Sequence, residues 1–178
     1  MISYVDALPE LRRFRKILVT GPNRSGTTIC SRMLDSDLPQ HMLFDERDVG
    51  VRSLSRLMKQ LATNGPDIIH GPCFSSLVQW MTGDMAVVFM QRLPCDIQKS
   101  QDRIGWTKRE AKWQLGQYFR YENRPVPKIT YEIWASHQKP MMQVPYFEIE
   151  YESLSSHPLW VPREKRVNFT NRQWKESE

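Results

Sequence analysis

The stretch KILVTGPNRSGTTICSRMLDSD, residues 16–37, decides the fold because it predicts a strand, a glycine loop and a helix in direct succession. Residues 16–20 form a short, β-branched apolar run that stops abruptly at Gly21, as a buried strand ends in a turn. After Gly26, apolar residues recur at helical spacing, at Ile29, Met33 and Leu34. We therefore expect a helix that begins inside the glycine loop.

The loop itself has the G-x-x-x-x-G skeleton of a phosphate-binding loop, and it lies where that function requires, between a strand and a helix. Such a loop offers a row of backbone N–H groups and the positive end of a helix to an oxyanion. Two threonine hydroxyls and one arginine add further donors. The predicted contacts to the ligand are Gly21, Asn23, Arg24, Ser25, Gly26, Thr27 and Thr28.

The loop departs from an ATP- or GTP-binding loop in one informative way. The lysine expected directly after the second glycine is replaced by Thr27, and the cation stands earlier, at Arg24. The segment 24–28, R-S-G-T-T, resembles the K/R-S-G-T-T segment of sulfotransferases that use 3′-phosphoadenosine 5′-phosphosulfate (PAPS). That resemblance implies that the loop holds the 5′-phosphosulfate of PAPS, and that Arg24 takes part in catalysis.

A second stretch, distant in sequence, resembles the same family. Residues 92–100, RLPCDIQKS, match the R-x-P-x-D-x-x-x-S stretch that grips the 3′-phosphate in sulfotransferases, so the resemblance assigns Arg92 and Ser100 to that phosphate. An arginine at a strand end can bind a phosphate through two nitrogens, and a serine in the following helix can donate a further hydrogen bond. A third, weaker match lies at residues 147–154, where a strand ends in Y-E-x-L; we expect its role to be structural.

Sulfuryl transfer to a hydroxyl or amine needs a base for the attacking group, and two residues compete for that role. Glu46 ends an expected strand, at a place where several branches of the family carry a catalytic glutamate. His70 ends the next expected strand in H-G-P, which resembles the H-x-P of cytosolic sulfotransferases. The unperturbed imidazole titrates close to neutral pH, which suits proton transfer. The sequence does not choose between these two residues.

Along the rest of the chain, short apolar runs alternate with helical patterns, which predicts an α/β, three-layer P-loop-type fold with a mostly parallel central sheet flanked by helices. We expect one domain over residues 1–178, which opens with a polar stretch before residue 16. Further strands are expected at 41–46, 67–71, 85–91 and 146–151. Further helices are expected at 51–62, 73–81, 94–105, 107–122 and 129–139.

Composition restricts the possible settings and partners. The chain has 40% hydrophobic residues, which is enough for one core, and a net charge of +5, which favours anionic ligands. Its apolar runs are too short to cross a bilayer and its start lacks a signal peptide, so we expect a soluble, cytoplasmic protein that does not bind membranes. The three widely spaced cysteines predict reduced, mostly buried thiols. Basic residues are interspersed with acidic ones, so nucleic acid is not an expected partner.

The sequence thus predicts a sulfotransferase that moves a sulfuryl group from PAPS to a hydroxyl or amine acceptor, leaves adenosine 3′,5′-bisphosphate as product and needs no metal. One alternative is a P-loop kinase or NTPase in which Asp45 holds a metal ion beside Thr27. The missing loop lysine disfavours that alternative. A second alternative is a non-catalytic module that binds a nucleotide or nucleic acid.

Overall fold

The computed structural model of the chain describes residues 1–49, 54–104 and 126–162. Its centre is a sheet of five parallel strands in the order β2-β3-β1-β4-β5. The strands are β1 (Lys16–Thr20), β2 (Met42–Asp45), β3 (Asp67–His70), β4 (Met85–Gln91) and β5 (Tyr146–Glu150). The predicted α/β class with a parallel sheet is confirmed, and the described strands are all parallel rather than mostly so.

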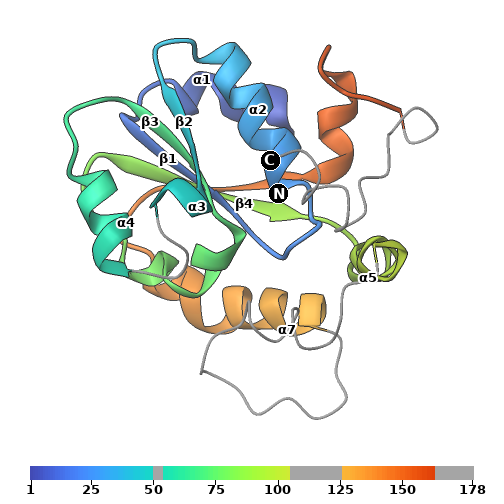
Figure 1. The fold of residues 1–178 in the computed structure, drawn as a ribbon. Helices are drawn as coiled ribbons and strands as arrows, with labels where there is room; N and C mark the ends of the chain where they lie inside the picture. Colours follow the sequence, from blue (N-terminus) through green and yellow to red (C-terminus); the bar gives the residue numbers. More distant parts are fainter. Residues whose placement is uncertain (50–53, 105–125, 163–178) are drawn as a thin grey trace.

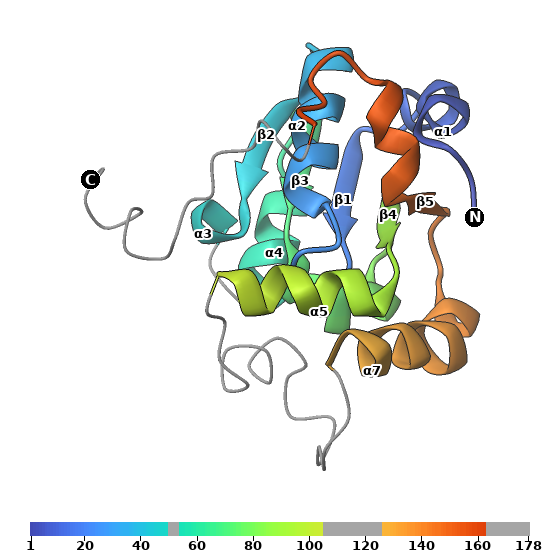
Figure 2. The ribbon, with the colours of Figure 1, turned by 90° about the vertical axis from the view of Figure 1, so that its right-hand side faces the viewer.

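Helices cover both faces of this sheet (Figures 1 and 2). α1, α2 and η6 lie on one face, while α4 and α7 lie on the other. The α-helices are α1 (Tyr4–Leu11), α2 (Thr27–Asp37), α3 (Glu46–Val49), α4 (Leu54–Leu61), α5 (Pro94–Arg103) and α7 (Val126–Ile133). The short helices are η1 (Pro72–Ser76), η2 (Val78–Trp80), η4 (Trp134–Gln138), η5 (Lys139–Met141) and η6 (Tyr151–Ser156).

The central strand β1 is buried along its whole length because its side chains alternate between two hydrophobic clusters. Ile17 and Val19 join the cluster under α1, α2 and η6, whereas Leu18 joins the cluster on the opposite face. Strands that are buried on both faces are continuously apolar, which is why the sequence pattern located β1 and β4 correctly.

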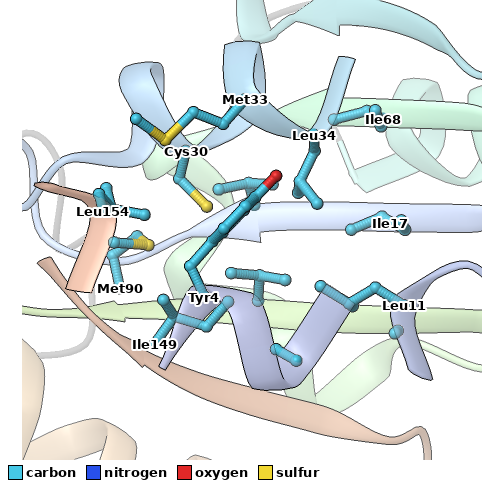
Figure 3. Close-up of a cluster of buried hydrophobic side chains, with 14 of the residues drawn as sticks. Tyr4, Leu11, Ile17, Cys30, Met33, Leu34, Ile68, Met90, Ile149 and Leu154 are labelled. Atoms are coloured by element: carbon cyan, nitrogen blue, oxygen red, sulfur yellow. The ribbon is translucent and has the colours of Figure 1, made fainter. Parts of the chain in front are cut away.

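One helix, α1, was not predicted from the sequence, in which the residues before 16 were described only as a polar stretch. α1 begins after Ser3, whose Oγ accepts a hydrogen bond of 3.2 Å from the backbone N–H of Asp6. Tyr4, Ala7 and Leu11 are buried at helical spacing, and Figure 3 shows the Tyr4 ring inside the first cluster. Both the capping serine and the helical spacing of the apolar residues are features of the local sequence.

Two expected helices differ in kind from the prediction. Residues 73–81 form no α-helix but the two 3₁₀ helices η1 and η2, in which Leu77 N–H donates to Phe74 O and Trp80 N–H donates to Leu77 O. The helix expected at 129–139 is α7 followed by the π-helical turn η4 and the 3₁₀ turn η5. The helix expected at 107–122 lies outside the described residues.

The cysteines are free thiols, as expected; Cys30 and Cys73 are buried and Cys95 is exposed. Burial raises the pKa of the Cys30 thiol to about 12, so it stays protonated at neutral pH. Within the parts of the chain that the structure describes, no helix has both the length and the apolar character needed to cross a membrane.

Candidate functional site

The candidate site lies at the carboxyl-terminal edge of the sheet, where all five parallel strands end. β2 and β3 end at Asp45 and His70, which face each other as Cα partners in the strand register. β1 leads into the loop 21–26, β4 into Arg92 and β5 into Tyr151. Residues from distant parts of the sequence therefore lie in one row that follows the strand order. Ligands of open parallel sheets bind at this edge.

The loop needs both of its glycines. Gly21 has φ of +132° and Gly26 has φ of +104°, in a region that side chains rarely adopt. A Cβ atom on Gly26 would also lie 2.3 Å from Cδ2 of Tyr151, closer than any real contact. Arg24 adopts positive φ as well, at +74°, although it carries a side chain. The loop is therefore held in a shape that its sequence alone does not favour at Arg24.

Two features suit the loop to an oxyanion. Among the described residues, no side chain caps the first turn of α2, whose N-cap is Gly26, so this helix directs its uncapped N–H groups and its positive end toward the loop. Ser25 is fully buried, and its Oγ has no hydrogen-bond partner among the residues that the structure describes. Buried hydroxyls are normally paired, so an unpaired one beside a helix N-terminus is suited to a ligand.

Three residues predicted to bind two different anionic groups meet at one place. Arg92 Nη1 donates a hydrogen bond of 2.8 Å to the backbone oxygen of Arg24. Arg24 Nε in turn donates to Ser100 Oγ at 3.2 Å. The structure thus brings the exposed loop cation, the arginine after β4 and the serine of α5 into hydrogen-bond contact. Two guanidinium groups beside an uncapped helix end create a strongly electropositive position.

Arg92 is held in place by two tyrosines that the sequence analysis did not assign to the site. Its guanidinium carbon lies 4.1 Å from the centre of the Tyr151 ring, a cation–π contact. Its backbone N–H donates to Tyr131 Oη at 2.9 Å. Burial raises the pKa of the Tyr131 hydroxyl above its ordinary value, so this hydroxyl stays protonated. Arg92 Nε is buried and has no hydrogen-bond partner among the described residues.

Helix α5 lies across the same edge of the sheet and contacts the loop (Figure 2). Gln101 Nε2 donates to the backbone oxygen of Asn23 at 3.3 Å, next to the contact between Ser100 and Arg24. Asn23 therefore has its main-chain oxygen toward α5, and Ser100 is buried under the loop. Ser100, which the resemblance assigned to a 3′-phosphate, thus lies beside the loop.

His70 sits between a carboxylate and the loop. Its Nδ1 lies 2.9 Å from Asp45 Oδ2, and its Nε2 lies 3.1 Å from Thr27 Oγ1 and 3.4 Å from Thr28 Oγ1. The loop threonines therefore contact the histidine that the sequence offered as a base. This row of carboxylate, imidazole and hydroxyl is a proton-transfer geometry.

Glu46, the other predicted base, is placed differently from its expected position. It does not end β2 but is the first residue of α3. Its Oε2 accepts a hydrogen bond of 3.1 Å from the backbone N–H of Cys73 in η1. The carboxylate thus ties α3 to η1, and the contacts that reach the loop threonines come from His70.

Comparison with protein-family models, with curated proteins and with solved structures finds no match to this chain. The described residues contain no group of three or more histidine, cysteine or acidic side chains arranged to hold a metal ion. The inferences about this site therefore rest on the positions and contacts of its own residues.

Sequence reasoning missed the roles of Asp45 and the two tyrosines for different reasons. Tyr151 stands in the Y-E-x-L match, which had been given a structural role, and the contact with Arg92 comes from the adjacency of β4 and β5. Asp45 had been considered only as a metal ligand in the kinase alternative. Tyr131 gave no sequence signal, because its hydroxyl reaches Arg92 only through the packing of α7 against the sheet.

Proposed function

We propose that this protein is a PAPS-dependent sulfotransferase of P-loop type, in which the loop 21–28 binds the 5′-phosphosulfate of the donor. The observation that carries the proposal is the contact of Arg92 with Arg24 and of Arg24 with Ser100, at 2.8 and 3.2 Å. Residues matched separately to a 5′- and a 3′-phosphate site are neighbours in space. Both phosphates of PAPS are attached to one ribose, so a donor of this kind requires such neighbours.

A nucleoside triphosphate carries its phosphates in a single chain, and the described site fits that ligand less well. β4 ends at Gln91 and is followed by Arg92, with no strand-end acid there to hold a metal ion. Asp45, the carboxylate that the kinase alternative requires, contacts the His70 ring. These contacts support a second anionic group, rather than a metal, beside the loop. We accordingly expect donor binding to need no divalent cation.

The protein's own residues would contribute position, charge and proton transfer. The loop N–H groups and Arg24 would orient the sulfuryl group and stabilise the charge that develops as the S–O bond breaks. Arg92 and Ser100 would hold the 3′-phosphate. His70 would take the proton from the attacking hydroxyl or amine, since its Nε2 lies beside the loop threonines, whereas Glu46 contacts the backbone of Cys73 in η1. The product of the donor would be adenosine 3′,5′-bisphosphate.

The test is a thermal-shift panel with PAPS, adenosine 3′,5′-bisphosphate, adenosine 5′-monophosphate, ATP with magnesium, and single-stranded DNA, each with and without EDTA. A ligand that binds the native state raises the melting midpoint by mass action. We expect the two 3′-phosphorylated ligands to give the largest shifts, unchanged by EDTA. Preference for ATP that EDTA abolishes would assign the protein to the kinases, and preference for DNA would assign it to the non-catalytic modules.

Binding alone does not show catalysis, so a second assay measures sulfuryl transfer. Sulfuryl transfer from labelled PAPS is measured against a panel of phenols, sugars and amines, because the donor site says nothing about the acceptor. Binding of adenosine 3′,5′-bisphosphate without transfer to any acceptor or to water would leave a nucleotide-binding module and remove the enzymatic proposal.

A further inference from the structure

Asp45, His70 and Thr27 form a row of three polar side chains at the carboxyl ends of β2 and β3 and the start of α2. The two nitrogens of the His70 ring are both engaged, Nδ1 with Asp45 at 2.9 Å and Nε2 with Thr27 at 3.1 Å. His70 and Thr27 are buried, whereas the side chain of Asp45 is 48% exposed. The row therefore runs from the solvent toward the loop.

The position of Asp45 follows from the strand register. Asp45 and His70 are Cα partners in the parallel pairing of β2 with β3, and each is the last residue of its strand. His70 is also a partner of Val19 on the other side, next to the residue that ends β1. The carboxylate and the imidazole are thus aligned by backbone hydrogen bonds rather than by flexible loops, which gives a rigid mutual geometry.

The chemistry of the row fixes the position of the ring proton. An ionised carboxylate can only accept hydrogen bonds, so the His70 nitrogen that faces Asp45 must carry the proton. In the neutral ring, Nε2 then has a lone pair, and the Thr27 hydroxyl donates its hydrogen to it. The opposite tautomer would put a lone pair on Nδ1 against the negative carboxylate. Nε2, the nitrogen that faces the loop, is therefore the proton acceptor.

The geometry points to Asp45 as the positioning residue of this site: it fixes the Nδ1–H tautomer of His70 and so keeps Nε2 ready to accept a proton beside the loop. This inference deepens the proposed function and rests on it for the role of His70 as the base. It also assigns Asp45 a purpose other than metal binding. Asp45 acts through His70 and is not itself expected to contact the donor or the acceptor.

The same arrangement couples proton uptake to the orientation of a loop hydroxyl. When Nε2 gains a proton, it becomes a donor and can no longer accept the hydrogen of Thr27. Thr27 is then free to turn its hydroxyl hydrogen toward an oxyanion bound at the loop. Acceptance of the proton and binding of the anionic product thus support each other.

The test is a two-bond ¹⁵N–¹H correlation spectrum of the full chain labelled at histidine, recorded at a pH high enough to give a neutral ring. The chain has 4 histidines, so the His70 signals are assigned by their loss in His70→Gln. We expect wild-type His70 to show the pattern of a protonated Nδ1 and an unprotonated Nε2. If the neutral ring of wild-type His70 instead carries its proton on Nε2, the inference is wrong, whatever the variants show.

Two variants, each of which lacks one carboxylate, then show whether Asp45 positions the His70 ring or only changes the net charge. Asp45→Ala removes the partner of Nδ1, whereas Asp84→Ala removes an exposed carboxylate from the loop before β4. We expect the first variant to move His70 toward the Nε2–H tautomer and the second to leave the spectrum unchanged. An unchanged tautomer in folded Asp45→Ala, verified by its amide spectrum, would refute the positioning role.

The outcome is independent of whether the protein is a sulfotransferase. If wild-type protein fails to bind adenosine 3′,5′-bisphosphate or to transfer a sulfuryl group, the proposed function fails while the tautomer experiment can still succeed. If transfer is found, Asp45→Ala should lower kcat at least about tenfold with little change in KM for the donor, because the base is misoriented while the phosphate contacts remain. A loss confined to KM would contradict the assigned role.

Discussion

Arg92 Nη1 donates a hydrogen bond of 2.8 Å to the backbone oxygen of Arg24, so the arginine that follows β4 holds the loop that follows β1. β1 and β4 are adjacent parallel strands in the sheet, and their carboxyl ends therefore open onto the same position. This contact joins two segments that are 68 residues apart and places the Arg92 guanidinium against the main chain of the loop that leads into α2.

Removal of the Arg92 side chain should weaken ligands with a 3′-phosphate selectively. A charge-assisted contact contributes about 1.5–3 kcal/mol, so Arg92→Ala should lower affinity for adenosine 3′,5′-bisphosphate about ten- to hundredfold more than affinity for adenosine 5′-monophosphate. Calorimetric titration of both ligands measures the difference. Arg103→Ala, which removes an exposed arginine from the end of α5, is the control. Equal losses for the two ligands in Arg92→Ala would contradict the assignment.

Loss of the Arg24 side chain should lower the rate of sulfuryl transfer while the protein still folds. Arg24→Ala should reduce kcat for sulfuryl transfer about 10²–10³-fold, the effect of removing one preorganised donor from a transition state. Arg24→Lys should recover part of that rate, since it restores the charge without the forked geometry. The measurement is single-turnover transfer from PAPS.

A glycine at the same position separates the chemistry of Arg24 from its backbone strain. Arg24 has φ of +74°, which costs a residue with a side chain about 1 kcal/mol or more relative to glycine. Arg24→Gly should therefore lose as much rate as Arg24→Ala yet melt at a higher temperature than it. Wild-type turnover in either variant would show that the loop cation is not catalytic.

Gly26 should be the least replaceable residue of the loop. Gly26→Ala combines a strained φ of +104° with a Cβ that would lie 2.3 Å from the Tyr151 ring, and should lower the free energy of unfolding by several kcal/mol. Gly83→Ala is the matched control because Gly83 has φ of +92°, but no heavy atom of the described part of the chain lies within 4 Å of the added Cβ. It should cost only about 1–2 kcal/mol of backbone strain. Urea unfolding of both variants compares them, and equal losses would mean that Tyr151 does not pack against the loop.

Glu148 in β5 should make the protein less stable in acid. Partial burial raises the pKa of this carboxyl, but hydrogen bonds from Lys139 and Trp134 outweigh that effect and hold the pKa below its ordinary value. The unfolded chain then binds more protons than the native one, so the stabilisation is present above the ordinary pKa of 4.5 and is lost as the pH falls through the lowered native value.

Glu148→Gln tests this linkage directly. At neutral pH the variant should unfold at a lower urea concentration than the wild type, and the difference should shrink as the pH falls below 4.5. A series of urea midpoints from neutral pH into acid measures it. A difference that stays constant with pH would mean that the Glu148 contacts contribute no proton-linked stability.

Some features of the chain are determined by local sequence. The apolar runs of β1 and β4 identified the two strands, and the glycines of the loop identified the turn between β1 and α2. These features depend on residue type and spacing over a few positions, which is the information that a sequence provides directly. Helix α1 is also marked by local sequence, by the Ser3 N-cap and by the helical spacing of Tyr4, Ala7 and Leu11.

Only the tertiary structure decided which side chains meet. The sequence left Glu46 and His70 equal as bases, since each ends a predicted strand. The pairing of β2 with β3 put His70 beside Asp45 and the loop threonines, while the start of α3 turned Glu46 toward the backbone of Cys73. Contacts of this kind depend on strand order and register, and those are set by the packing of the whole sheet rather than by the residues on either side of the contact.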